Sequence, residues 1–293
     1  MNTLDVMFTM DCEAIADLAA EGGPKTWEFC GKAIAGYCET LFARNLKPTL
    51  FVVPYTAEKI APLLLEMEKE GAELGLHYHP QDYGYADYLG AYDYDEQHKM
   101  LSEACRMWED ALGKAPVSFR GGNFSANDHT FSVLRDLGFS QGSLSVPGRN
   151  FTRVKSNWAG SPMLPYHTNR ANRLLEGNMD FLEIPTTADW ESTMWGGLTK
   201  LELRVEMVDA RAHGFTVRKS VDRQLEQRIE HPYLLALTHN IFDYSDLHEF
   251  RRQVLDGLIA EIDSYAEKKE LIRKGYTLSD YHQEVDTRRR CET

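Results

Sequence analysis

Short apolar runs of β-strand type alternate along the chain with longer stretches in which apolar residues recur every three or four positions. The longer stretches have the spacing of amphipathic helices, and several of them end at a glycine that suits a helix C-cap. Strands are expected near residues 4, 48, 72, 117, 139, 181, 233 and 275, and helices at 57–71, 95–113, 127–138 and 247–268.

This alternation predicts an α/β fold with a mostly parallel sheet. Seven or eight repeated βα units favour a (β/α) barrel over an open doubly wound sheet. No GxGxxG motif follows the first strand, so the sequence does not support a dinucleotide fold. We find no internal repeat and no linker, and therefore expect a single domain over residues 1–293, with an irregular insertion at about 145–176.

The composition narrows the class of protein. Of the 293 residues, 43% are hydrophobic and 26% are charged, which is typical of a soluble globular protein. The formal net charge of −13 argues against broad binding to nucleic acid or to an anionic membrane. The sequence shows no signal peptide and no apolar run long enough to span a membrane, and its five cysteines are scattered and odd in number. These features predict reduced thiols and a cytoplasmic location.

Polar side chains follow two of the predicted strands in pairs. Asp11 and Glu13 are two residues apart in FTMDCE, and His77 and His79 are two apart in GLHYHP. On an extended backbone, residues i and i+2 project from the same face, with Cα atoms roughly 6.5 Å apart. Two imidazoles at that spacing can converge on one metal ion, and two neighbouring carboxylates are unfavourable unless a cation lies between them or one takes a proton. Either pair alone is commonly structural, but together at two barrel strand ends they favour a metal site.

Two further strand ends carry ionisable side chains. Arg120 lies in SFRGGNFS and could hold a carboxylate in its ionised form, although it could also form a structural salt bridge within the barrel. His239 ends YLLALTHN and suits the protonation of a leaving group. Glu183 or Asp189, from FLEIPTTADW, is offered as the carboxylate that orients His239.

The stretch at 145–176 is rich in proline, glycine and basic residues, with Glu176 as its only acid. A structureless segment of this length is usually functional or mobile. It could bind an anionic part of a substrate at the barrel mouth, or it could be a solvated basic loop on an acidic protein. The candidate substrate-binding residues are Arg149, Arg153 and Trp158 from this stretch, together with Trp190 from the later strand region, where an aromatic ring could stack on a sugar or pack in the core.

Four motifs, FTMDCE, GLHYHP, FRGGNFS and ALTHN, occur in the order found in NodB-homology polysaccharide deacetylases, carbohydrate esterase family 4. The chain resembles this family over residues 5–245, and especially its cytosolic members encoded with surface-polysaccharide biosynthesis genes. The sequence differs from the family pattern at three places. Cys12 follows Asp11 where a second aspartate is frequent, the histidine motif is HxH rather than HxxxH, and Asn240 replaces a frequent proline.

The resemblance implies a distorted (β/α)7 barrel and assigns roles to the motif residues. Asp11 would be the general base, positioned by Arg120, and His239 the catalytic histidine. Glu13, His77 and His79 would bind a divalent metal ion, zinc in the first place, with Mn, Co, Ni or Fe as alternatives.

The function that we expect is deacetylation of an N-acyl amino sugar in surface-polysaccharide (O-antigen-type lipopolysaccharide) biosynthesis. The substrate could be nucleotide-linked or lipid-linked. Two alternatives remain open: a hydrolase of the same fold that acts on a non-sugar amide, as allantoinase-like proteins do, and a non-catalytic carbohydrate-binding barrel. The sequence does not predict the oligomeric state.

Overall fold

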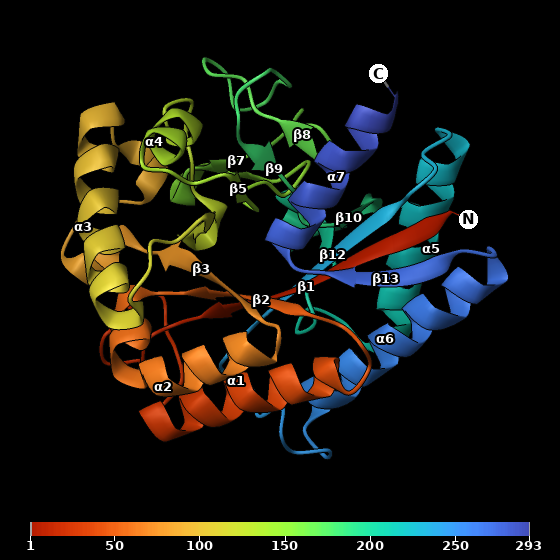
Figure 1. The fold of residues 1–293 in the computed structure, drawn as a ribbon, viewed down its shortest axis with the longest axis horizontal. Coiled ribbons are helices and arrows are strands. Elements are labelled where there is room, and N and C mark those ends of the chain that lie inside the picture. Colours follow the sequence, from red (N-terminus) through yellow and green to blue (C-terminus); the bar gives the residue numbers. More distant parts are fainter. Residues whose placement is uncertain (1, 293) are drawn as a thin grey trace.

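A computed structural model describes residues 2–292 of the chain. Its centre is a curled sheet with the strand order β12–β1–β2–β3–β4–β5–β9–β8, and β13 pairs with β1 (Figure 1). The pairs from β12 to β9 are parallel, as is the pair of β1 with β13, and β8 runs antiparallel to β9. The strands of this sheet are β1 (Thr3–Cys12), β2 (Pro48–Val52), β3 (Glu73–Tyr78), β4 (Ser118–Gly121), β5 (Gln141–Gly142), β8 (Tyr166–His167), β9 (Leu182–Glu183), β12 (Tyr233–His239) and β13 (Ile272–Tyr276).

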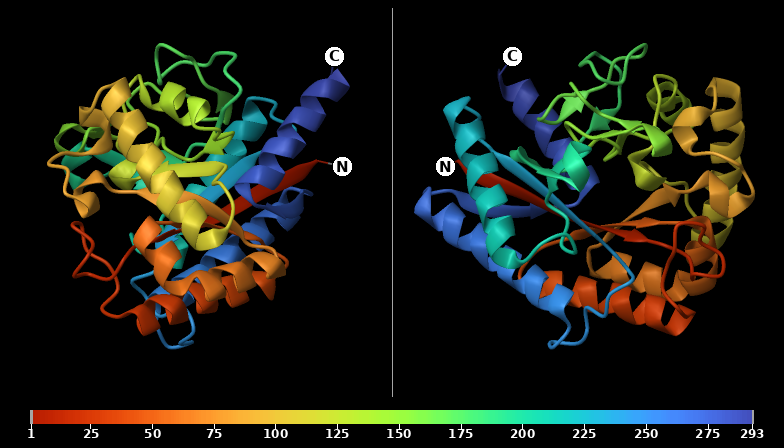
Figure 2. Two further views of the ribbon diagram at one scale, coloured as in Figure 1. Left: turned by 60° about the vertical axis from the view of Figure 1, so that its left-hand side comes forward. Right: turned by 180° about the vertical axis from the view of Figure 1, so that it is seen from behind.

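Helices follow most of the parallel strands and lie outside the sheet. Figures 1 and 2 show α1, α2 and α6 on the same outer side of the sheet in every view. Every residue of β1 is buried, because β1 is central in the sheet and is covered on both faces. Its buried polar residues, which include Asp5 and Asp11, therefore need partners within the protein. The helices are α1 (Trp27–Phe42), α2 (Pro54–Glu70), α3 (Tyr94–Leu112), α4 (Thr130–Asp136), α5 (Ala210–Glu226), α6 (Phe250–Lys268) and α7 (Leu278–Glu292).

Single main-chain hydrogen bonds bridge the gap between β9 and β12. The Thr187 amide donates to the Leu235 carbonyl at 3.2 Å, and the Leu237 amide donates to the Leu203 carbonyl at 3.0 Å. The Val205 amide donates to the Leu237 carbonyl, also at 3.0 Å. The sheet therefore curls into a barrel that is closed by isolated contacts, which confirms the predicted distorted (β/α) barrel.

The eight predicted strands are all present, although the last lies earlier than expected. The pattern near residue 275 predicted one strand, whereas β13 ends at Tyr276 and α7 begins at Leu278. The first turn of α7 packs on the N-terminal ends of the strands, because the Leu278 amide donates to the Thr49 side chain and the Ser279 amide to Glu73. We therefore expect the catalytic site at the other end of the barrel, where the C-terminal ends of the strands lie.

The stretch at 145–176 is less irregular than its composition suggests. It contains a small hairpin of β6 (Asn150–Phe151) and β7 (Ser156–Asn157), and then β8. Its first part lies at the C-terminal end of the barrel, where Arg149 Nη1 donates to the Asn123 carbonyl just after β4. Its later part reaches the opposite end, where the Met163 carbonyl accepts from the hydroxyl of Tyr233, the first residue of β12.

Two other sequence expectations concern thiols and membrane spans. Cys12, Cys30, Cys38 and Cys105 are free, whereas the side chain of Cys291 lies outside the part that the structure describes. Cys12 points into the core, away from Asp11, and burial raises the pKa of its thiol well above the usual value. None of the helices within residues 2–292 combines the length and the apolar character needed to cross a bilayer.

Candidate functional site

The strand register brings the predicted polar residues together. Asp11 on β1 lies directly opposite His239 on β12, and His77 on β3 lies directly opposite Arg120 on β4. All four stand at or near the C-terminal ends of parallel strands, which meet at one end of a barrel. Residues that are far apart in the sequence therefore share a single site.

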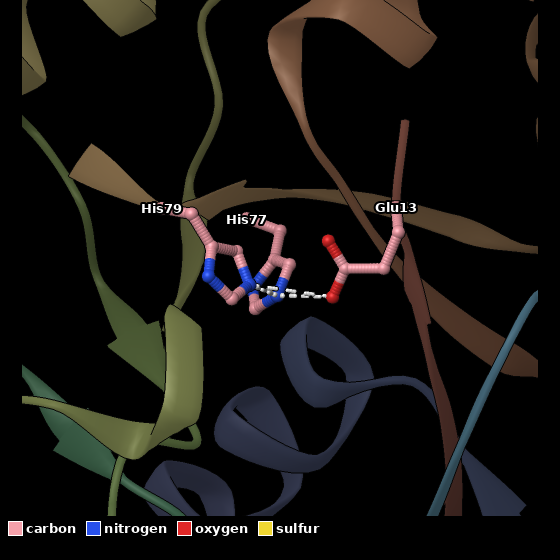
Figure 3. Close-up of side chains that lie close together, drawn as sticks. All are labelled: Glu13, His77 and His79. Atoms are coloured by element: carbon pink, nitrogen blue, oxygen red, sulfur yellow. Dashed lines mark hydrogen bonds and ion pairs between the residues drawn. The ribbon is translucent and has the colours of Figure 1, made fainter. Parts of the chain in front are cut away.

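Glu13, His77 and His79 point toward one another at this end (Figure 3). Glu13 Oε1 lies 3.2 Å from His77 Nε2 and 3.3 Å from His79 Nε2, and the two Nε2 atoms are 3.1 Å apart. All three side chains are buried. Ligand atoms about 2.0–2.1 Å from one tetrahedral zinc ion lie roughly 3.3 Å from one another, so these separations are those of a metal site.

The protonation of His77 supports this interpretation. Its Nδ1 lies 2.8 Å from the Arg120 carbonyl, which can only accept a hydrogen bond, so Nδ1 carries the proton. The Nε2 lone pair of neutral His77 therefore faces the Glu13 carboxylate and the ring of His79. Such converging lone pairs repel one another unless a cation lies between them. The three side chains thus fit a divalent metal ion of the kind that accepts nitrogen and oxygen ligands.

Asn240 fixes the main chain of Glu13. The Glu13 amide donates to Asn240 Oδ1 at 3.0 Å, and Asn240 Nδ2 donates to the Glu13 carbonyl at 3.0 Å. A proline could make neither side-chain bond. The residue that departs from the family pattern therefore orients a predicted metal ligand.

Asp11 is held by Arg120. Arg120 Nη1 donates to Asp11 Oδ1 at 2.7 Å and to the Thr9 hydroxyl at 2.9 Å, and its Nε donates to the Ser143 carbonyl at 3.0 Å. Burial alone would raise the pKa of Asp11, but the charge of Arg120, with those of His77 and His239, holds it below its usual value. Asp11 is thus kept ionised, with Oδ2 free of Arg120 and directed toward the two histidines, 3.9 Å from His77 Nε2 and 3.8 Å from His239 Nε2.

The carboxylate that orients His239 is Glu206, which the sequence interpretation missed. Glu206 Oε1 lies 2.5 Å from His239 Nδ1, and Glu206 Oε2 accepts from the Thr238 hydroxyl at 2.9 Å. Burial would lower the pKa of His239, but the charge of Glu206 and its hydrogen bond, together with Asp11, raise it above the usual value. His239 is therefore suited to carry a proton on Nε2, beside Asp11.

The two carboxylates proposed from the sequence as partners of His239 are used elsewhere, so that proposal was wrong. Glu183 accepts from the Leu144 amide and from the Ser145 amide and hydroxyl, and burial raises its pKa to about 7. Asp189 accepts from Lys219 and from the Ser192 hydroxyl. Glu183 thus binds the segment that follows β5, and Asp189 binds Ser192 and Lys219, so neither carboxylate orients His239.

Gly122 leaves the room that the His79 ring needs. A Cβ at this position would lie 2.4 Å from His79 Nδ1, which is too close for any real contact. We predict that Gly122→Ala displaces the ring and weakens metal binding on the order of 10–100-fold, as for the loss of an outer-shell contact. Equilibrium dialysis against zinc measures this effect. The control is Gly31→Ala, whose Cβ would meet only the flexible side chain of Leu63 at 3.2 Å, and equal affinity in the two variants would contradict the prediction.

The predicted substrate-binding residues have different surroundings. Arg149 is buried and forms an ion pair with Glu202, and Trp158 is buried, with its Nε1 donating to the Phe124 carbonyl. Both side chains therefore make packing contacts and offer no surface to a substrate in this conformation. Arg153 is exposed in the first part of the stretch.

Trp190 lies on β10 (Ala188–Met194), which pairs with β11 (Thr199–Glu202). It lines a cavity of about 290 Å³, beside Arg223 and Tyr233. Tyr233 is the first residue of β12 and His239 is its last, and six residues of strand span roughly 20 Å. The cavity is therefore separate from the cluster of Asp11 and the histidines.

Comparison with known proteins agrees with this geometry. Residues 28–142 match the polysaccharide deacetylase family. The chain is similar to three solved structures: a protein of Mycobacterium smegmatis assigned as a polysaccharide deacetylase (19% identity, TM-score 0.66, 98% of this chain and 92% of the other), one of Pseudomonas aeruginosa PAO1 assigned likewise (16%, 0.59, 95% and 89%), and PuuE allantoinase (15%, 0.60, 95% and 89%).

No curated protein matches the chain. At these identities the three structures show the fold alone. The family match contains His77, His79 and Arg120. The family match and the shared fold together confirm the predicted resemblance to polysaccharide deacetylases and the expectation of a hydrolase of that type.

Proposed function

Because the chain has the fold of polysaccharide deacetylases and residues 28–142 match that family, we propose that it is a metal-dependent deacetylase of an N-acyl amino sugar. One observation carries the proposal. An ionised aspartate and a histidine suited to hold a proton, Asp11 and His239, face each other across 3.8 Å beside the three-residue cluster of Glu13, His77 and His79. Amide hydrolysis needs a base, an acid and a polarising group in this kind of arrangement.

Glu13, His77 and His79 would hold the divalent metal ion, as their converging ligand atoms indicate. The bound ion would polarise the acyl oxygen and lower the pKa of a water at the site.

Asp11 acts as the general base. Its Oδ2 takes a proton from the attacking water, while Arg120 holds Oδ1 and keeps the carboxylate ionised. The water oxygen then forms a bond with the acyl carbon. Because Asp11 is fixed on a buried strand end, this proton transfer needs little reorganisation of the protein.

His239 acts as the general acid. Its Nε2 proton passes to the amine nitrogen as the carbon–nitrogen bond breaks, while Glu206 holds Nδ1 and stabilises the imidazolium. The products are a carboxylic acid and a free amino sugar. The non-catalytic alternative is not favoured, since a base, an acid and a set of metal ligands would have no reason to be kept together in a decayed site.

Within this proposal the substrate is a cytoplasmic precursor of a surface polysaccharide, carried on a nucleotide or lipid diphosphate. The exposed Arg153 and the half-buried Lys155, in the first part of the 145–176 stretch, are two basic side chains that would contact an anionic carrier at this end of the barrel. Lys155 would then exchange its ion pair with Asp87, in which Nζ and Oδ2 are 4.0 Å apart, for the carrier. Their position next to the loop after β4 supports the proposal, because the Ala126 amide donates to the Lys155 carbonyl.

The proposal is tested with a substrate panel. Purified protein with zinc is incubated with N-acetyl and N-formyl amino sugars, free and nucleotide-linked, and with non-sugar amides such as allantoin, and the released acid or amine is measured. We expect release from N-acyl amino sugars. Turnover of the non-sugar amides alone would replace the sugar proposal, and no turnover of any substrate would refute the hydrolase.

Glu206→Gln is predicted to move the alkaline limb of the pH profile of kcat/KM to lower pH. The general acid must be protonated, and the negative charge of Glu206 raises the pKa of His239. Removing that charge lowers the pKa, so activity is lost at a lower pH as the pH rises. Glu230→Gln, at an exposed position, serves as the control. An unshifted alkaline limb in Glu206→Gln would exclude His239 as the acid.

A further inference from the structure

A second group of metal-ligating side chains lies at the other end of the barrel. His167 is on β8, and His282 and Asp286 are one turn apart on α7, so they face the same way. His167 Nε2 lies 3.8 Å from Asp286 Oδ1, and His282 Nε2 lies 3.7 Å from Asp286 Oδ2. The three ligand atoms lie within 4.8 Å of one another, which a metal ion could draw together with small movements of the side chains.

Both histidines are held in the tautomer that a metal needs. His167 Nδ1 lies 3.1 Å from the Met179 carbonyl, so Nδ1 carries the proton and donates it. His282 Nδ1 lies 3.0 Å from Gln141 Oε1, while Gln141 Nε2 donates to the hydroxyls of Ser118 and Ser279. In the neutral state, each Nε2 therefore presents a lone pair to the space beside Asp286. Metal-binding histidines are typically oriented by such outer hydrogen bonds.

His282 Nε2 is also buried without a hydrogen-bond partner, and the residue is only 8% exposed. A buried polar atom left unpaired costs on the order of 1–3 kcal/mol, so such atoms usually have a ligand, a water or an ion. Asp286 faces this atom from the solvent side, with about half of its side chain exposed. The proposed site thus has a buried side, formed by His282, and a side that solvent can reach, at Asp286.

We propose that His167, His282 and Asp286 bind a divalent transition metal ion of the zinc class, with a water completing the coordination. Two imidazoles and a carboxylate suit zinc and related ions. The bound ion would join β8, in the 145–176 stretch, to α7, which covers the N-terminal ends of the barrel strands. Its role is structural, because Gln141 begins β5 at this end, whereas Asp11 stands near the end of β1 at the other.

Zinc content per chain, measured by elemental analysis after dialysis, tests this site. Wild-type protein is expected to hold two equivalents, and the His77→Ala/His79→Ala variant one. His282→Asn keeps a donor for Gln141 but lacks Nε2, and is expected to lose one equivalent while retaining deacetylase activity. Because the second equivalent is measured in both backgrounds, failure of the catalytic site and failure of this site are distinguishable.

Asp286→Asn is a second variant, at a partly exposed position. Because Asp286 is a proposed ligand, the variant is expected to weaken zinc binding in the His77→Ala/His79→Ala background by more than the roughly 10–100-fold that loss of an outer-shell partner costs. Zinc should also raise the melting temperature in that background, and not after Asp286→Asn is added. His129→Ala, at an exposed histidine, is the control. Unchanged zinc content and melting response in both His282→Asn and Asp286→Asn would overturn the proposal.

Discussion

Asp11→Asn is expected to reduce turnover on the order of 10²–10⁴-fold while leaving the metal content unchanged. The substitution keeps the size of the side chain but removes the charge and the basicity of Oδ2. Asp11 Oδ2 is 3.9 Å from His77 Nε2, farther than the 3.1–3.3 Å separations among Glu13, His77 and His79, so it is not a principal metal ligand. Steady-state kinetics together with elemental analysis measures both effects.

The same strand offers a matched control for this variant. Asp5 is also buried on β1 and also pairs with an arginine, Arg288, but at the opposite end of the barrel. Asp5→Asn removes a buried charge of the same kind, so its cost to folding should be comparable, and kcat should remain at the wild-type value. If Asp11→Asn retained wild-type turnover, Asp11 would not be the base.

The His77→Ala/His79→Ala variant is expected to lose the catalytic metal ion and with it all measurable deacetylation. Both imidazoles approach Glu13 Oε1 within 3.3 Å, so their removal leaves one carboxylate, which cannot hold a transition metal alone. The barrel should still fold, because the core formed by β1, β12 and the surrounding helices does not depend on these side chains. Metal content, activity and a cooperative melting transition are measured together.

The control is His98→Ala/His129→Ala, which also removes two histidines, one exposed and the other half-buried, but neither in the site. It should keep both metal and activity. Full metal occupancy at the catalytic site in His77→Ala/His79→Ala would show that other residues bind the ion.

The fold and most of the site could be predicted because strand periodicity is local. A two-residue spacing at a strand end places Asp11 and Glu13, or His77 and His79, on one face without knowledge of the rest of the chain. A parallel barrel then brings such strand ends together. The sequence also identified Arg120 and His239, because each ends an apolar run.

Glu206 could not be identified in this way. It follows a short chain segment that reaches β12 through an isolated bridge between Arg204 and Leu237, and no periodic pattern marks that contact. The sequence offered Glu183 or Asp189 instead, and Glu183 lies within the recognisable strand β9. The structure instead uses Glu183 to bind the amides of Leu144 and Ser145.

The basic stretch shows a related limit. The basic composition around Arg149 predicts an exposed side chain, because its counter-ion, Glu202, lies far along the chain. Burying one charge of such a pair without its partner is strongly unfavourable, and a local pattern cannot show the second partner. Trp158 is likewise placed by its contact with Phe124 and not by its basic neighbours.

The central claim is that Glu13, His77 and His79 hold the metal ion on which deacetylation depends. The most direct measurement is the release of acid from an N-acyl amino sugar by chelator-treated protein, before and after zinc is added back. We predict no release by the metal-free protein, recovery on addition of zinc, and no recovery in His77→Ala/His79→Ala. Full activity in the metal-free protein, or equal recovery in the variant, would contradict the claim.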